Sequence, residues 1–183
     1  MTRTQHSLYL LNTQDSYFCE HPQLTESQPY EIEHEILKVS ISDLVPHEGI
    51  LDWHLKEIRD WMEKDGFQAR PIAVSRLDGL GPKWKGKLLI HDGHHRTAAL
   101  KALSCSKILV SVFNFSDPRI IVTDYNDLTI PVSKETVIEQ ATSGVKLTPR
   151  FDKHFILAND ERHPFHDNPL IEPEIPVKLS ELK

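Results

Sequence analysis

The chain has 183 residues, which is enough for one domain with an appended segment. Apolar residues make up 39% of it and charged residues 26%, so it can build a hydrophobic core. The net charge of -6 argues against a general nucleic-acid binder, and no apolar stretch approaches the ~20 residues of a membrane helix. Its 2 cysteines lie in unrelated contexts and predict no disulfide framework. We therefore expect a reduced, cytoplasmic protein without nucleic-acid or membrane partners.

The N-terminal part differs in composition from the rest. Residues 1–30 are polar, and Pro22 and Pro29 break any period, so we expect an irregular arm with at most one short strand at Ser7–Leu11. Residues 31–183 carry the periodic patterns and are expected to form the domain itself.

The first periodic elements are a strand and a helix. Glu33–Ile41 alternates loosely between polar and apolar residues, which predicts a strand. Apolar residues then recur every three or four positions over Leu51–Lys64, which predicts an amphipathic helix. We expect Asp52 to be its N-cap and Gly66 its C-cap.

Two further helices alternate with β-rich runs. One helix is expected over Asp92–Leu103, and another follows its cap Ser133, continues through Gln140 and stops at Gly144. Strands are expected at Arg70–Ser75, Lys87–His91, Ile108–Phe113 and Ile120–Val122. Prolines dominate the remainder, which predicts mostly extended chain. This order of elements predicts a compact α+β domain.

The pentapeptide Asp92–Arg96 is the main candidate site. A strand that runs into Gly93 and then a helix directs backbone N–H groups and the positive end of the helix dipole at one point, which suits an anion. His94, His95 and Arg96 add donors for phosphate or carboxylate and can neutralise developing charge. Asp92 can orient an imidazole or hold Mg²⁺ through water. The pattern therefore predicts a site for a charged small substrate.

Two other segments carry candidate groups. In Val45–Glu48, the glutamate can act as a general base if it reaches a substrate hydroxyl, or simply support the helix that follows. In Thr148–His154, cations with a hydroxyl can bind a carboxylate or a phosphate, although an exposed basic loop fits the composition equally well. His163 and His166, with Asp167, raise the question of a metal, but the prolines around them favour an ordinary loop.

These three segments, in this order, resemble the ParB/sulfiredoxin-like superfamily, and within it the free L-serine kinases that use ADP or ATP. The C-terminal residues Pro176–Leu182 add to the resemblance, which spans roughly Val39 to the end. It implies a small mixed sheet with helices packed on it. It also implies a phosphotransferase that needs Mg²⁺ and acts on a small hydroxyl amino acid. ADP and ATP both stay open as the donor, and the sequence leaves the oligomeric state open.

The resemblance also implies residue roles. Glu48 would deprotonate the substrate hydroxyl, and the pentapeptide would face the transferring phosphate and Mg²⁺. Nucleotide phosphates or the amino-acid carboxylate would be held by Gly93, His94, His95, Arg96, Thr148, Lys153 and His154.

Two departures from the kinases affect these expectations. The segment between Arg96 and Thr148 is shorter than in the kinases, and Phe151–Lys153 replaces a hydroxyl-rich sequence. The acceptor or donor can therefore differ. An alternative is a ParB-like module that binds or hydrolyses nucleotide to control a partner and needs no acceptor. The absence of a DNA-binding tail and the presence of Glu48 favour the kinase.

Overall fold

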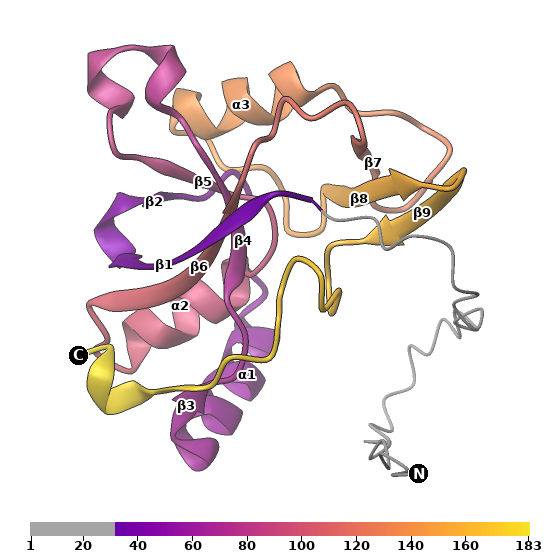
Figure 1. Ribbon diagram of the computed structural model, residues 1–183. Helices are drawn as coiled ribbons and strands as arrows, with labels where there is room; N and C mark the ends of the chain where they lie inside the picture. The colour runs from indigo at the N-terminus through magenta and orange to yellow at the C-terminus, as the bar shows by residue number, and fades with distance from the viewer. Residues whose placement is uncertain (1–31) are drawn as a thin grey trace, which may run out of the picture.

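The computed structural model describes residues 32–183, so the predicted arm at residues 1–30 and its short strand lie outside the described residues. A five-stranded mixed sheet forms the centre of the described part (Figure 1). From one edge to the other its strands are β1 (His34–Ser40), β6 (Lys107–Phe113), β4 (Ile72–Arg76), β5 (Leu88–Ile90) and β2 (Leu44–Val45). The four strand predictions that fall on this sheet are confirmed to within a few residues, and β2 is an additional short edge strand.

Both faces of this sheet are buried, because successive side chains on a strand point to opposite sides. On β4, Ile72 and Val74 join one hydrophobic cluster, while Ala73 between them joins the other. On β5, Leu88 and Leu89 divide between the clusters in the same way. The central strands are therefore mostly apolar, as expected for strands covered on both sides.

Helices α1 (Asp52–Asp65) and α2 (His94–Ala102) pack against each other and cover one face, in the lower part of Figure 1. Both predicted helices are confirmed, and Gly66 caps α1 in a left-handed conformation with φ 79°. The predicted N-cap of α1 is wrong by one position. Leu51 is the N-cap and makes no side-chain capping bond, while Asp52 is already helical and places its carboxylate in the first turn.

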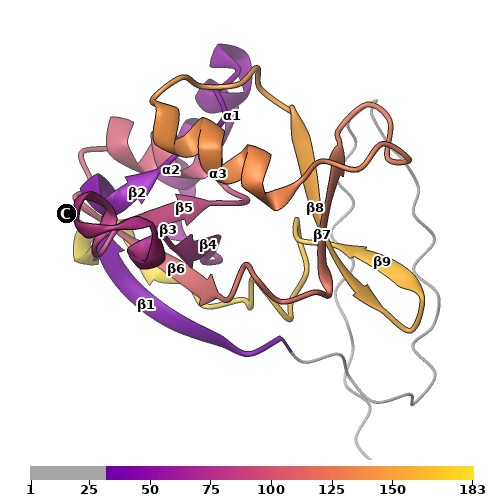
Figure 2. The same ribbon diagram turned by 90° about the horizontal axis from the view of Figure 1, so that it is seen from above.

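The other face is covered by α3 (Lys134–Ser143) and a three-stranded antiparallel sheet. Ser133 caps α3 as predicted, since its hydroxyl accepts a hydrogen bond from the amide of Thr136. The small sheet stands beside the large one in both views (Figures 1 and 2). Its strands are β7 (Ile120–Asp124), β8 (Asp152–Ala158) and β9 (Glu161–Pro164). The hairpin of β8 and β9 was predicted only as extended chain.

The C-terminal segment returns to the first layer. Strand β10 (Val177–Lys178) pairs with β3 (Phe67–Gln68) just after α1, and Leu182 is fully buried in the cluster beneath α1 and α2. The carbonyl of Leu182 accepts hydrogen bonds from Ser106 and Lys107 at the start of β6. The predicted α+β architecture, a small mixed sheet with helices packed on it, is confirmed. Within residues 32–183, no helix is long and apolar enough to cross a bilayer.

Candidate active site

The sheet topology brings the three candidate segments together. Strands β2 and β5 are parallel, with Val45 opposite Leu89, so the residues that follow both strands emerge at the same edge. The third segment joins them because Glu48 forms an isolated parallel bridge with Leu147. In that bridge the amide of Leu147 donates to the carbonyl of His47 over 2.8 Å. Segments about a hundred residues apart in sequence thus meet at one place.

A cavity of about 280 Å³ lies where they meet. The predicted site residues that line it are Glu48, Asp92, Gly93, His94, His95, Arg96, Lys153 and His154. Thr148 is exposed and is not among the lining residues. Other lining side chains come from α1, from the end of β7, from the entry to β8 and from the segment after β9: His54, Ile58, Tyr125, Arg150, Asp152, Phe165 and His166.

The turn before α2 depends on its glycine. Gly93 has φ 97°, in the left-handed region, and is the N-cap of α2. A Cβ atom at this position would overlap the side chain of Ile72 on β4. The turn therefore packs directly on the sheet, and the N-terminus of α2 faces the cavity with the partial positive charge of its dipole.

The charged side chains of this turn are engaged by partners within the protein. Arg96 donates 2.5 Å hydrogen bonds to Asp92 and to Glu172, and a further one to the carbonyl of Pro71. His166 lies 3.7 Å from the same carboxylate oxygen of Asp92. Arg96 was expected to face the transferring phosphate, but its guanidinium already donates to Asp92 and Glu172.

The protonation of this network follows from its burial. Burial alone would raise the pKa of Asp92, but the hydrogen bond with His166 and the charge of Arg96 outweigh it and lower that pKa. Burial raises the pKa of Glu172 to about 8, against the opposing charge of Arg96. Asp92 is thus the ionised partner of Arg96, and Glu172 holds a proton at neutral pH.

Glu48 is held by backbone amides. Its carboxylate accepts hydrogen bonds from the amides of Phe151 at 2.8 Å, Asp152 at 3.1 Å and Arg150 at 3.3 Å. Arg150 has φ 60°, a left-handed conformation that turns these successive amides toward one point. Burial, followed by the charge of Asp152, raises the pKa of Glu48 although the amides oppose this. The result is a fixed carboxylate that is more basic than an ordinary glutamate.

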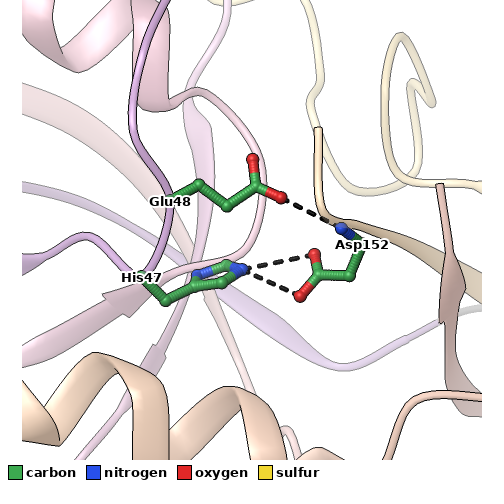
Figure 3. A group of neighbouring side chains, drawn as sticks. All are labelled: His47, Glu48 and Asp152. Atoms are coloured by element: carbon green, nitrogen blue, oxygen red, sulfur yellow. Dashed lines mark hydrogen bonds and ion pairs between the residues drawn. The ribbon is translucent and has the colours of Figure 1, made fainter. Parts of the chain in front are cut away.

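A buried hydrogen-bonded group begins beside Glu48, with His47 and Asp152 (Figure 3). His47 is fully buried, and its Nε2 lies 3.0 and 3.2 Å from the two carboxylate oxygens of Asp152. His154 lies 3.4 Å from Asp152 on its other side and is hydrogen-bonded to His91 at 3.1 Å, and His91 is in turn bonded to Ser75 at 2.7 Å. Every imidazole in this group is oriented by a partner.

Most of the imidazoles around the cavity are neutral. Burial lowers the pKa of His91 and His94 well below the ordinary value, and lowers that of His154 to about 4. His95 accepts a hydrogen bond from the amide of Leu51 at 2.9 Å, and burial, with nearby positive groups, lowers its pKa to about 4. They therefore act as hydrogen-bonding groups rather than as cations.

Several site residues escaped the sequence reasoning. His47 stood in a quoted motif without a role, Asp152 counted only as a departure from the kinases, and Glu172 carried no local signal. The partners of Asp152 and Glu172 lie 105 and 76 positions away in sequence. The contact of Asp152 with His47 and His154 indicates a site only once β8 is known to start at Asp152.

The chain has the fold of known kinases. It superposes on a free serine kinase in complex with AMP with a TM-score of 0.64 and 13% identity, over 85% of this chain and 98% of that one. It also superposes on C-terminally truncated SbnI from Staphylococcus aureus with a TM-score of 0.57 and 15% identity, over 81% and 89% of the two chains. The α+β domain of the free serine kinases and SbnI is therefore the fold of this protein.

Sequence similarity points in the same direction. An ATP-dependent L-serine kinase of Staphylothermus marinus is 25% identical over 127 residues, which cover 69% of this chain and 48% of that protein. Another, of Desulfurococcus mucosus, is 35% identical over 89 residues, 49% of this chain and 32% of that protein. The chain thus spans half or less of the length of these curated relatives. No protein-family model matches it. The resemblance to the free L-serine kinases is confirmed.

Proposed function

We propose that the protein is a phosphotransferase that moves a phosphoryl group from ATP or ADP to the hydroxyl of free L-serine or a closely related amino acid. The observation that carries the proposal is the cavity, where the fixed carboxylate of Glu48 and the N-terminus of α2 face the same space. The similarity to proteins named ATP-dependent L-serine kinase, and to a free serine kinase that binds AMP, supports it.

In this proposal Glu48 is the general base. Phosphoryl transfer needs an oriented hydroxyl oxygen more than covalent chemistry, so a carboxylate that accepts the hydroxyl proton is sufficient. Its raised pKa brings its basicity nearer to the working pH, and the amides of Phe151 and Asp152 fix its position. The substrate hydroxyl would donate its proton to the carboxylate as the phosphoryl group arrives.

The phosphates would bind across the turn Asp92–Arg96, which we call the phosphate turn. The amides at the N-terminus of α2 supply donors without a net charge, and Gly93 allows close approach. Lys153 lines the same cavity and would supply a cation. Thr148, also expected to bind phosphate, is exposed and does not line the cavity. Arg96 and His154 would act by positioning, since their polar atoms engage Asp92 and Asp152.

Mg²⁺ is the expected companion of the nucleotide phosphates, where it neutralises charge that develops during transfer. The cavity offers the carboxylate oxygens that Mg²⁺ prefers. Asp92 was the expected ligand through water, but its Oδ2 engages Arg96 and lies near His166. In this proposal Asp92 would therefore reach Mg²⁺ only through a bound water, which leaves its hydrogen bond with Arg96 in place.

We also propose that residues 31–183 form a catalytic domain with an extended C-terminal segment, and that residues 1–30 are an irregular arm. The partners would be a nucleotide and a small hydroxyl amino acid, with no nucleic acid or membrane involved. Both substrates are abundant in the cytoplasm, which we propose as the location of the reaction.

The test is phosphorus NMR of the purified protein with Mg²⁺, ATP or ADP, and a panel of free amino acids. We expect a new phosphomonoester resonance with serine and one of the two nucleotides, which would identify donor and acceptor together. A resonance with another hydroxyl compound would keep the reaction and change the acceptor. Inorganic phosphate alone, or an unchanged spectrum with every combination, would contradict the proposal.

A further inference from the structure

We propose that His47, Glu48 and Asp152 form a divalent-metal site within the protein, filled without any nucleotide and selective for Mn²⁺ over Mg²⁺. One potential ligand atom from each of these side chains lies within 4.8 Å of the others (Figure 3). This site would hold an ion separate from the Mg²⁺ that accompanies the nucleotide. Its catalytic use rests on the proposed kinase function, but its occupancy does not.

The hydrogen bonds of His47 indicate which of its ring nitrogens is free to bind a metal. Its Nδ1 lies 3.0 Å from the carbonyl oxygen of Ile90, and a carbonyl only accepts, so Nδ1 carries the proton. In a neutral imidazole, Nε2 then presents a lone pair to the carboxylate of Asp152. Two electron-rich atoms face each other across this gap, so a proton or a metal ion must lie between them. Metal-ligating histidines are commonly fixed by such a bond to a backbone carbonyl.

The distances fit metal ligands. Two donors at right angles around a small divalent ion, each about 2.1 Å from it, lie about 3.0 Å apart. Nε2 of His47 lies 3.0 and 3.2 Å from the oxygens of Asp152. Glu48 supplies the third donor from the side of the cavity. A carboxylate has two oxygens, so Glu48 can contact the ion with one and accept a proton with the other.

An independent observation comes from His94. This side chain is 8% exposed, and its Nε2 is buried without a hydrogen-bond partner among residues 32–183. Its ring meets that of His47 edge-on, with 4.8 Å between the ring centroids. His94 also lines the cavity beside Glu48 and Asp152. A buried donor atom without a partner next to three metal-type ligands is accounted for by an ion or its bound water.

The donor set distinguishes transition metals from Mg²⁺. Carboxylate oxygens alone suit Mg²⁺, but an imidazole nitrogen shifts preference toward transition metals. Of these, Mn²⁺ accepts mixed oxygen and nitrogen ligands with the same octahedral habit as Mg²⁺. We therefore expect Mn²⁺ to bind at least about tenfold more tightly than Mg²⁺.

The experiment is a Mn²⁺ titration of the full chain, without nucleotide or serine, followed by the electron paramagnetic resonance signal of free Mn²⁺. We expect one bound Mn²⁺ per chain and weak competition by Mg²⁺. His47→Gln and Asp152→Asn should each weaken binding about 10–100-fold. Glu161→Gln, an exposed carboxylate on β9, is the matched control and should leave binding unchanged.

Pulsed electron paramagnetic resonance of the bound Mn²⁺ gives a second readout, the coupling of the ion to nearby nitrogen nuclei. Coupling to a ring nitrogen is expected in the wild-type protein and should vanish in His47→Gln, with circular dichroism confirming that both proteins are folded. Three results would overturn the site: no Mn²⁺ binding at millimolar concentration, binding without nitrogen coupling, or unchanged affinity in folded Asp152→Asn. Each would mean that a proton, not a metal ion, lies between His47 and Asp152. A metal-loaded protein that forms no phosphoserine would overturn the kinase proposal and leave the metal site intact.

Discussion

The two sides of the cavity use their charged groups differently. On the phosphate turn, Arg96 and Asp92 bind each other and Glu172, so the side chains hold the turn together. On the opposite side, backbone amides hold Glu48, and its carboxylate lines the cavity. The first side offers backbone dipoles to a ligand, and the second offers a fixed carboxylate.

In the proposed mechanism this difference separates the groups that bind phosphate from the group that acts as base. A motif rich in charge, such as Asp92–Arg96, draws attention as a catalytic centre, yet most of its charge is balanced internally. The less conspicuous segments around Glu48 and Lys153 place their functional groups in the cavity. Substitutions on the phosphate turn should therefore affect stability strongly, and substitutions on the other side should affect turnover.

The largest expected effect is on turnover. Glu48→Gln keeps an oxygen that accepts hydrogen bonds from the amides, so the fold should persist. Loss of the base should lower kcat for phosphoserine formation about 10²–10⁴-fold. Glu63→Gln, an exposed change on α1, is the control and should behave as wild type. Near-normal turnover in Glu48→Gln would remove the base assignment.

Loss of Glu172 should mainly reduce stability. Glu172→Ala leaves the buried Arg96 with one fewer acceptor and should lower the free energy of unfolding by about 2–3 kcal/mol in urea titrations. Glu172→Gln retains an acceptor and should cost much less. An equal loss in both variants would show that side-chain volume matters more than the hydrogen bond.

The same residue predicts an alkaline effect. The pKa of Glu172 rises from an ordinary 4.5 in the unfolded chain to about 8 in the fold. Its contribution is therefore complete below pH 4.5 and is lost as the pH rises through about 8. The melting temperature of the wild type should fall over this range more than that of Glu172→Gln. Parallel curves for the two proteins would contradict this protonation.

Acid should lower the free energy of unfolding, because it protonates buried histidines on both sides of the cavity. Burial lowers the pKa of His154 to about 4, from the ordinary 6.5. Between these pH values the unfolded chain binds a proton at His154 that the folded protein does not. The associated stability is present above pH 6.5 and is lost as the pH falls toward 4, a change on the order of 3 kcal/mol. His91 and His94 contribute in the same direction. Urea titrations at both pH values measure it, and a His154→Gln variant should lose less.

The smallest expected effect is the loss of stability when a glycine is replaced by alanine. Comparing two glycines separates the cost of the backbone conformation from the cost of a steric clash at the phosphate turn. Gly93 and Gly86 both have a positive φ, but only at Gly93 would a Cβ meet another side chain, that of Ile72. Gly86→Ala should cost about 1 kcal/mol and Gly93→Ala about 2–3 kcal/mol. Equal losses in thermal unfolding would mean that the turn does not pack tightly on β4.

Sequence patterns predicted the elements whose signals are local. The helix at Asp92–Leu103 and the central strands follow from apolar periodicity, and α3 follows from its cap Ser133 and its stop at Gly144. Strand β8 was missed because its first inward-facing residues, Asp152 and His154, are polar. Their burial depends on partners that no local pattern reveals.

The sequence likewise predicted the parts of the site that are contiguous in the chain, but not the contacts between distant segments. Contiguous Asp92–Arg96 indicated an anion site, but the balance of its charge depends on Glu172, which a distant extended segment supplies. The pairing of His47 with Asp152 likewise needs the bridge between Glu48 and Leu147 to bring two chain segments together. Long-range pairing of this kind is fixed by topology, so single-sequence reasoning names the residues and misses their partners.

The most direct test of the account is the stoichiometry of nucleotide consumption, measured with and without serine in the same preparation. Phosphoryl transfer predicts one phosphoserine for each nucleotide consumed, and negligible consumption when serine is omitted. Nucleotide consumed at the same rate without any acceptor would contradict the account and indicate a hydrolysing module instead.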